Sequence, residues 1–260
     1  MDVHTELAEA LADILWRAEE TQTPVPPLTQ EHPELSADTA YQVQLRNVAR
    51  KVERGDRVVG HKIGLTSKPM QIMLGVNEPD YGHLFASMRF SSGEKVDHPL
   101  LQPKVEPEVA FVLKEDLSGP DATLYDVLRA TDYVVPAIEI IDSRIADWKI
   151  KLPDTVADNA SSGCFVLGRQ LTRAEDCDLG CVGMVMRING EVAQTGATAA
   201  VLGHPAVGVA WLANKLAEFG TRLRAGDIVL SGSVCAAVPV RPGDRVSVSF
   251  GRLGGVEVRF

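Results

Sequence analysis

Apolar residues near the N-terminus recur at the spacing of an amphipathic helix. The pattern predicts a helix over residues 5–20, whose buried face carries Leu7, Leu11, Ile14, Leu15 and Ala18. A Pro-rich linker at 23–27 ends this helix, because proline lacks the backbone N–H that a helix needs. Ser36 is a suitable N-cap for a second helix that ends near Gly55. Residues 1–55 are therefore expected to form a small helical region, followed by a core over residues 56–260.

Beyond Gly55 the helical spacing is replaced by short apolar segments separated by turn residues. The expected strands lie at 57–65, 105–113, 133–141, 183–187, 191–194, 227–231, 237–240, 245–250 and 256–260, and the expected helices at 68–74, 123–131 and 205–219. Asn189-Gly190 predicts a type I′ turn between two of the strands. Because strands and helices do not alternate regularly, the pattern favours an α+β fold with an antiparallel or mixed sheet over a doubly wound sheet or an (α/β) barrel.

Composition narrows the classes of function. The chain has 260 residues, 45% of them hydrophobic, and a formal net charge of −9 at pH 7. An acidic chain without a basic run is not expected to bind nucleic acid. No segment approaches the ~20 apolar residues of a membrane span and residues 1–20 do not resemble a signal peptide, so a cytoplasmic protein without membrane contact is expected. The cysteines lack the spacing of a zinc site and are expected to be reduced thiols: Cys164, Cys177, Cys181 and Cys235.

Two glutamates in the segment 105–113 are candidates for metal binding. In a strand, Glu106 and Glu108 point to the same face, because side chains alternate with a period of two. Two ionised carboxylates this close repel, and a hard divalent cation between them removes the conflict. An exposed edge strand, with both carboxylates in water, is the alternative, and the pair taken alone favours it.

Glu139 shifts the preference from an exposed edge strand to a metal site, since it lies within the apolar segment 134–141. A charge in such a strand needs a partner, either a structural ion pair or a shared cation. We therefore predict a metal site formed by Glu106, Glu108 and Glu139. The lack of a matching His pair favours Mg²⁺ or Mn²⁺ over zinc. A nucleotide cofactor and a serine nucleophile are not expected, because neither G-x-G-x-x-G nor G-x-S-x-G occurs.

Several longer motifs, taken together, resemble a known family. They are GHKIGLTSK at 60–68, GVNEPDYGHL at 75–84, PKVEPEVAFVL at 103–113, AIEIIDSRIADWKIKLPDTVADNASSG at 137–163 and LGHPAVGVAWLANKL at 202–216. The chain resembles the 2-hydroxypentadienoate (2-keto-4-pentenoate, vinylpyruvate) hydratases and the 2-oxo-3-hexenedioate (4-oxalocrotonate) decarboxylases of the fumarylacetoacetate hydrolase superfamily. The resemblance implies a mixed β-roll core after a small helical region, the three glutamates as metal ligands, and a homo-oligomer. It also implies a small 2-oxo or 2-hydroxy acid substrate from aromatic meta-cleavage catabolism, and association with a pathway decarboxylase or aldolase is a further expectation.

Within this family, short motifs bear on the choice of reaction. Asp80, in Pro-Asp-Tyr-Gly at 79–82, and the segment 147–151 are hydratase-like, whereas 235–240 is closer to some decarboxylases. We therefore expect a hydro-lyase that converts a 2-hydroxy-2,4-dienoate into a 4-hydroxy-2-oxo acid, with the decarboxylase as the alternative. An acylpyruvate hydrolase and a non-catalytic partner subunit are more distant alternatives.

The family motifs also suggest the acid–base residues. Lys62 lies where a strand enters a turn, and partial burial near a metal would lower its pKa for proton transfer at the 2-oxygen of the substrate. Outside that motif a solvated lysine is the simpler interpretation. Asp80 is expected to orient or deprotonate water, or to protonate the carbon chain; a turn residue is the alternative.

Small polar residues at 158–163 are expected to hold the substrate carboxylate. Ser161 is the first candidate, with Asn159 and Asp158 beside it; an Asx turn or helix cap is the alternative. His83 is a further candidate for substrate binding, although a hydrogen-bonded structural histidine fits equally well, as it does for His61. Asp142 and Arg144 are expected to form an ion-pair element that positions the strand of Glu139.

Overall fold

The computed structural model describes residues 3–260. Its α-helices are α1 (Val3–Thr21), α2 (Leu28–Glu31), α3 (Ala37–Glu53), α4 (Lys68–Leu74), α5 (Leu124–Ala130), α6 (Leu152–Ala157) and α7 (Pro205–Glu218). Its strands are β1 (Val58–Gly64), β2 (Asp80–Phe85), β3 (Arg89–Ser91), β4 (Lys104–Leu113), β5 (Thr131–Ile141), β6 (Ser162–Leu167), β7 (Gly183–Ile188), β8 (Glu191–Ala197), β9 (Ile228–Leu230), β10 (Val238–Pro239), β11 (Arg245–Phe250) and β12 (Gly254–Arg259). No helix of the described part of the chain is both long and apolar enough to span a membrane.

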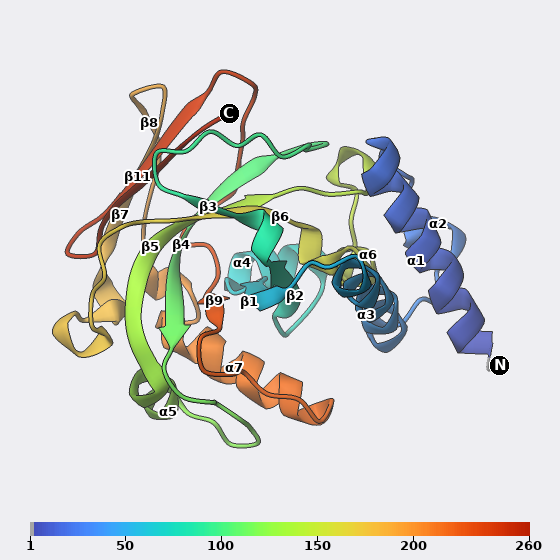
Figure 1. The fold of residues 1–260 in the computed structure, drawn as a ribbon, viewed down its shortest axis with the longest axis horizontal. Helices are drawn as coiled ribbons and strands as arrows, with labels where there is room; N and C mark the ends of the chain where they lie inside the picture. Colours follow the sequence, from blue (N-terminus) through green and yellow to red (C-terminus); the bar gives the residue numbers. More distant parts are fainter. Residues whose placement is uncertain (1–2) are drawn as a thin grey trace.

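The strands form two sheets that share one hydrophobic core (Figure 1). The larger sheet has the order β2-β1-β9-β4-β5-β6-β3, with β10 also paired to β4, and the smaller has the order β12-β11-β7-β8. Most neighbours are antiparallel, but β1 pairs with β9, and β3 with β6, in parallel. The mixed sheet confirms the predicted α+β class. Strand β5 is apolar on both faces, because it contacts strands β11 and β12 of the other sheet as well as its own neighbours.

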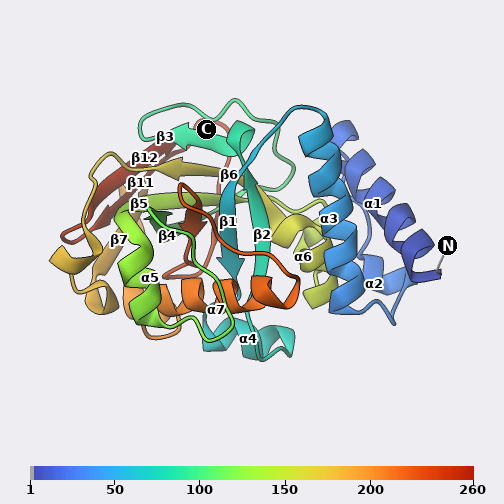
Figure 2. The same ribbon diagram turned by 60° about the horizontal axis from the view of Figure 1, so that its bottom comes forward.

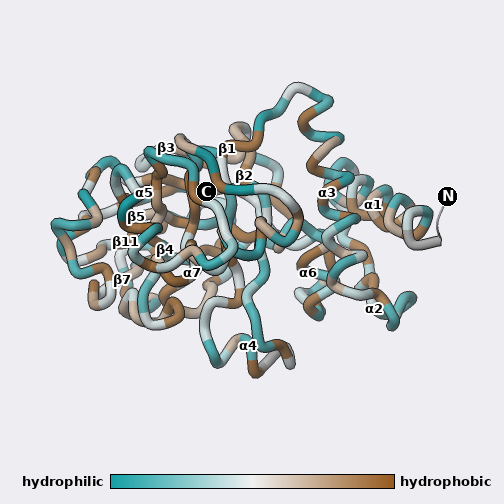
Figure 3. Tube along the Cα trace, turned by 90° about the horizontal axis from the view of Figure 1, so that it is seen from below, coloured by the Kyte–Doolittle hydropathy of each residue, from teal (hydrophilic) through white to brown (hydrophobic). Residues whose placement is uncertain are grey.

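The N-terminal helices pack to one side of the strands, opposite the smaller sheet (Figure 2). Both α1 and α3 carry apolar and polar stretches (Figure 3), and α1 packs against α3. Leu11, Leu15 and Ala18 of α1 are buried as predicted, whereas Ile14, which was also expected on the buried face, is exposed. The N-cap prediction is confirmed, since Ser36 Oγ accepts a hydrogen bond from the backbone N–H of Thr39 at 3.2 Å. The linker at 23–27 is non-helical, as predicted, and it is followed by a short helix that was not predicted, α2. The division into 1–55 and 56–260 stays a prediction.

The hairpin prediction is also confirmed. Asn189 and Gly190 both have positive φ, 53° and 91°, as a type I′ turn requires. Strand β8 continues to Ala197, three residues past the expected end. In contrast, the sequence pattern did not predict β2, β3, β6 or α6, which the structure contains. Strand β2 has the sequence DYGHLF, which lacks β-branched residues, and it is held in the sheet by its pairing with β1.

Candidate metal centre and active site

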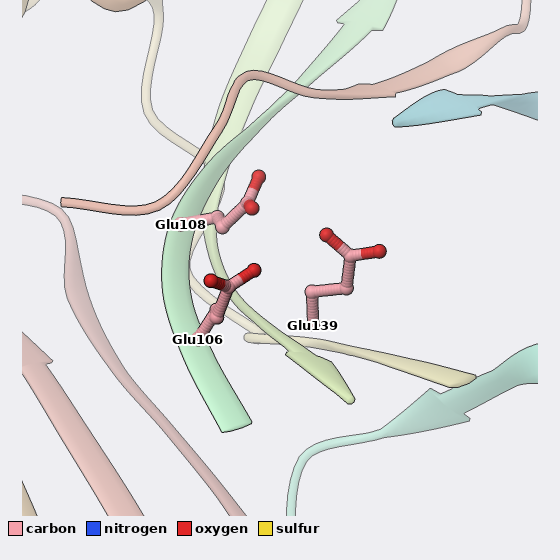
Figure 4. A group of neighbouring side chains, drawn as sticks. All are labelled: Glu106, Glu108 and Glu139. Atoms are coloured by element: carbon pink, nitrogen blue, oxygen red, sulfur yellow. The ribbon is translucent and has the colours of Figure 1, made fainter. Parts of the chain in front are cut away.

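Three carboxylates meet on one face of the larger sheet. Glu106 in β4 lies directly opposite Glu139 in antiparallel β5, and Glu108 follows two residues along the same strand. One oxygen from each lies within 4.8 Å of the others, and Figure 4 shows the side chains converging. Glu108 and Glu139 are buried and Glu106 is partly exposed. The edge-strand alternative is wrong, because β4 lies between β9 and β5 in the sheet interior.

The electrostatics of this cluster favour a bound cation. Burial and the neighbouring charge of Glu139 raise the pKa of Glu106 to about 7. Burial likewise raises the pKa of Glu108 well above its usual range, and it raises the pKa of Glu139 despite the opposing charge of Lys62. Glu139 Oε2 is buried with no hydrogen-bond partner among the described residues. Oxygen atoms arranged in this way suit a hard divalent cation, which stabilises all three ionised carboxylates together.

One backbone N–H and one side-chain hydroxyl orient two of the three carboxylates. Gly232 N–H donates to Glu108 Oε2 at 2.8 Å, and Ser162 Oγ lies 3.4 Å from Glu139 Oε1. Gly232 has φ +110°, and a Cβ there would lie 2.2 Å from Thr66 Oγ1, so glycine is required for this close approach. Neither Gly232 nor Ser162 was predicted, because the residues that donate to a carboxylate carry no motif of their own.

Lys62 contacts this cluster from β1. Its Nζ donates to the carbonyl of Ala160 at 2.9 Å and lies 3.3 Å from Glu139 Oε1. The prediction of partial burial with a lowered pKa is wrong. The side chain is buried almost completely, and although burial acts to lower its pKa, the charges of Glu139 and Asp80 raise it above the usual range. The alternative of a solvated lysine is excluded by the same burial.

Asp80 begins β2 and is also buried, so the alternative of an exposed turn residue is wrong. It pairs with Gly64, where a Cβ would lie 2.2 Å from Asp80 Oδ1, so the absence of a side chain at Gly64 makes room for the carboxyl. Thr155 Oγ1 donates to Asp80 Oδ2 at 3.3 Å, whereas Oδ1 has no partner in the described part of the chain. Burial raises the pKa of Asp80, and the charge of Lys62 opposes this.

The segment that was expected to hold the substrate carboxylate forms a left-handed turn. Asn159, Ala160 and Ser161 have φ values of 53°, 50° and 52°, which are unfavourable for residues with a Cβ. The turn directs the Ala160 carbonyl at Lys62 and places Ser161 Oγ 3.4 Å from Thr155 Oγ1. The Ser161 side chain is thus linked to Asp80 through Thr155.

The other predicted substrate-binding side chains have protein partners. The Asn159 amide accepts from His83 N–H at 2.7 Å and donates to its carbonyl at 2.9 Å. The Asp158 carboxylate pairs with Arg144, and burial raises its pKa to about 6. His83 Nδ1 lies 2.9 Å from Gln44 Oε1. His83 pairs with His61, whose side chain alternates with that of Lys62 along β1 and so points to the opposite face of the sheet.

The predicted ion pair forms at Arg144, but its partner is Asp158 and not Asp142. Arg144 donates to the Asp158 carboxylate and to the carbonyls of Asp158 and Ser162, and the Asp142 carboxylate accepts the backbone N–H groups of Leu101 and Gln102. Together these contacts fix the end of β5 against the turn at 159–161. The structure therefore brings together Lys62, Asp80, Glu106, Glu108, Glu139 and Ser161, and it does not place the side chains of His83, Asn159 and Asp158 among them.

Comparison with known proteins places this arrangement in a family. Residues 78–260 match the family model of the fumarylacetoacetate hydrolase C-terminal domain. A 2-keto-4-pentenoate hydratase from Paraburkholderia xenovorans is 47% identical, covering 97% of this chain and 94% of the relative. A 4-oxalocrotonate decarboxylase from a Pseudomonas species is 45% identical over 96% of both chains.

A solved structure extends the likeness to three dimensions. The 4-oxalocrotonate decarboxylase of Pseudomonas putida G7, complexed with magnesium and adipate, has a TM-score of 0.95 at 43% identity, covering 98% of this chain and 97% of that one. Sequence and fold thus agree over nearly the whole length of the chain. The chain belongs to the fumarylacetoacetate hydrolase family, in the group that contains the 2-keto-4-pentenoate hydratases and the 4-oxalocrotonate decarboxylases.

Proposed function

We propose that this protein is a metal-dependent hydratase. It would add water to a short 2-hydroxy-2,4-dienoate, of the 2-hydroxypenta-2,4-dienoate type, and release a 4-hydroxy-2-oxo acid in aromatic meta-cleavage catabolism. The observation that carries the proposal is the burial of Lys62 and Asp80 on the face that bears the carboxylate cluster. A charged amine and a carboxyl beside a metal site are the groups that proton transfer along a conjugated acid requires.

Glu106, Glu108 and Glu139 would hold the cation, with Mg²⁺ or Mn²⁺ as the proposed metals. When bound, the cation would withdraw electron density from the carboxylate and 2-oxygen of the substrate. The magnesium in the decarboxylase relative supports this assignment. The unpartnered Oε2 of Glu139 supports it independently, since this oxygen is buried and has no hydrogen-bond donor among the described residues.

The proposed chemistry moves protons at two carbon atoms and one oxygen, and it adds a hydroxyl group at a third carbon. The 2-hydroxyl group loses its proton as C5 gains one, which gives a 2-oxo-3-enoate. Water then adds across C3 and C4, so that the hydroxyl goes to C4 and the remaining proton to C3. The net change is the addition of one water molecule, without an oxidant or a reductant.

Lys62 would act at the 2-oxygen of the substrate. An ammonium group has three N–H donors, and the contacts to Ala160 and Glu139 engage two of them. The third would hold the 2-oxygen as negative charge develops there. Asp80, with an unpartnered oxygen and a pKa raised by burial, would exchange a proton with the carbon chain or with the attacking water.

Ser161 is the proposed contact to the substrate carboxylate, because its hydroxyl lies beside Thr155 on the side of the turn that faces Asp80. Asp158, Asn159 and His83 stay predicted substrate-binding residues. Their contacts to Arg144, to strand β2 and to Gln44 favour a structural role, in which they hold the turn at 159–161 and β2 in place.

The second candidate is decarboxylation of a 2-oxo-3-hexenedioate. It is supported by the decarboxylase relatives and by the segment 235–240. Burial raises the pKa of the Cys235 thiol in this segment, and the neighbouring charge of Glu106 raises it further. One experiment separates the two reactions. The purified protein with Mg²⁺ or Mn²⁺ is mixed with each substrate, dienoate loss is followed by ultraviolet absorbance, and products and CO₂ are measured.

We expect a 4-hydroxy-2-oxo acid from the dienoate, and much less turnover by the Glu139→Ala variant. Rapid CO₂ release from the dioate without hydration of the dienoate would replace the hydratase by the decarboxylase. We also propose a homo-oligomer located in the cytoplasm, able to associate with a pathway decarboxylase or aldolase. Light scattering during size-exclusion chromatography, with and without the partner enzyme, tests the assembly.

A further inference from the structure

A buried hydroxyl for which the sequence predicted no role lies between two residues of the proposed site. Thr155 Oγ1 is 3.3 Å from Asp80 Oδ2, to which it donates, and 3.4 Å from Ser161 Oγ. Thr155 is 4% exposed, and Asp80 and Ser161 are buried to the same degree. Both separations are long for O–H···O bonds, as is common in active sites before substrate binds.

The chemistry of a hydroxyl group decides which atom donates in each of these two hydrogen bonds. Thr155 has one proton, and that proton is directed at Asp80. Its oxygen then accepts the proton of Ser161, since a hydroxyl donates once and accepts through its lone pairs. One side chain therefore orients both the carboxyl proposed for proton transfer and the hydroxyl proposed for substrate binding.

Helix α6, which carries Thr155, is held by the N-terminal helices. The Asp154 carboxylate accepts the backbone N–H of Thr29 at 3.0 Å and its hydroxyl at 2.8 Å, which ties α6 to α2. Gln44 Nε2 in α3 donates to the carbonyl of Val156 at 2.8 Å and to that of Tyr81 at 3.1 Å. The residues on both sides of Thr155 are thus fixed, and one amide joins α6 to the strand that begins with Asp80.

We propose that Thr155 is a positioning residue for Asp80. Its hydroxyl holds the carboxyl in the orientation that directs Oδ1 at the substrate, and the N-terminal helices hold Thr155 in place through Gln44 and Asp154. This inference rests on the proposed function, because it assigns the residue that prepares Asp80 for that reaction. The helical region then serves the active site, although it contributes none of the groups that react.

The first test compares Thr155→Val with Thr155→Ser. Valine keeps the shape and removes the hydroxyl, whereas serine keeps the hydroxyl. We expect kcat to fall about 10- to 100-fold in Thr155→Val, the loss that a misplaced catalytic group causes. We expect Mn²⁺ affinity to change less than about threefold, and KM, which depends on the Ser161 contact, to rise less than kcat falls. Thr155→Ser should retain most activity, as positioning through the hydroxyl requires.

A matched control accounts for the general cost of altering a buried threonine. Thr131 lies on β5, eight residues before Glu139. It is 3% exposed, and its hydroxyl donates to the carbonyl of Val127. Thr131→Val should leave kcat within about twofold, because it touches no group of the site. An equal loss of kcat in Thr155→Val and Thr155→Ser, or a loss no larger than in Thr131→Val, overturns the inference.

A double-mutant cycle shows whether Thr155 acts through Asp80. In the Asp80→Asn background the carboxylate is gone, so Thr155→Val should lower the residual kcat less than about twofold. The same 10- to 100-fold loss in both backgrounds would contradict a role through Asp80.

A crystal structure gives a readout that does not depend on turnover. The Asp80 carboxyl should keep its orientation in Thr155→Ser and rotate away in Thr155→Val. An unchanged Asp80 in Thr155→Val overturns the inference even for a wild-type enzyme that hydrates no dienoate. Inactivity of the wild-type protein on both substrates would overturn the proposed function alone, so the two failures are distinct.

Discussion

Lys62 Nζ lies 3.3 Å from Glu139 Oε1, and the other oxygen of that carboxylate is buried without a hydrogen-bond partner among the described residues. The two oxygens of the Glu139 carboxylate therefore have different partners. Oε1 faces the ammonium group of β1, and Oε2 is free for a cation shared with Glu106 and Glu108. This arrangement links the proposed metal directly to the residue that would stabilise charge at the substrate.

Glu139→Gln tests this link. Glutamine keeps the size of the side chain but removes the charge that attracts both Lys62 and a cation. We expect Mn²⁺ affinity, measured by calorimetry, to fall more than about 10-fold, since loss of even a supporting residue has an effect of this size. Glu115→Gln changes an exposed carboxylate and is the control. Equal Mn²⁺ affinity in both variants would contradict the proposed ligand set.

Lys62→Met should lower kcat by about 10²- to 10⁴-fold, which is the contribution of a positioned acid–base group. The change also removes the positive charge beside the carboxylate cluster. We therefore expect the metal-free variant to unfold at lower temperature than the metal-free wild type, and Mg²⁺ to restore much of the difference. Lys149→Met, at an exposed position, should leave both quantities unchanged. Near-normal kcat in Lys62→Met would remove Lys62 from the mechanism.

Asp80→Asn separates acid–base chemistry from metal binding. Asn is nearly isosteric but cannot exchange a proton, so kcat should fall about 10²- to 10⁴-fold. Mn²⁺ affinity should change little, because Asp80 is not one of the three clustered carboxylates. Asp147→Asn, at an exposed position, is the control. A parallel loss of kcat and metal affinity would instead make Asp80 part of the metal site.

Removal of the metal should make stability depend on pH. Burial raises the pKa of Glu106 from 4.5 to about 7, so between these values the folded state binds more protons than the unfolded state. Stability is then present below about pH 4.5 and is lost as the pH rises towards 7. Thermal unfolding in EDTA should show a Tm that falls across this range.

Mg²⁺ should reverse that slope, since the cation binds the ionised carboxylates, which become more abundant as the pH rises. Glu106→Gln removes one titrating group and should flatten the fall in EDTA. A Tm in EDTA that rises between pH 5 and pH 7 would show that burial of the cluster does not dominate the titration.

Gln44→Leu tests the attachment of the N-terminal helices. The amide donates to two carbonyls and pairs with His83, and it is 1% exposed. Leucine leaves these groups unsatisfied, so the free energy of unfolding in urea should fall by about 2–4 kcal/mol. Gln42→Leu, at an exposed position of the same helix, should change it by less than about 0.5 kcal/mol. Equal effects of the two substitutions would show that Gln44 is not a structural connection.

Local sequence determined those features whose cause lies within a few residues. Ser36 starts a helix because its own side chain satisfies a backbone N–H of the first turn. Asn189-Gly190 forms a hairpin turn because both residues tolerate positive φ. Glu106 and Glu108 share a face because strand residues alternate with a period of two, and this holds whatever the strand pairs with.

Tertiary structure decided everything that depends on which segments meet. Pairing of β4 with β5 sets Glu139 opposite Glu106, and no local pattern fixes that register. Strand β2 escapes prediction because its place in the sheet comes from β1, and Thr155 escapes because its partners lie in β2 and in the turn at 159–161. The pKa of Lys62 shows the same division. Burial alone lowers the pKa of a lysine, and only the folded chain surrounds this one with carboxylates that raise it.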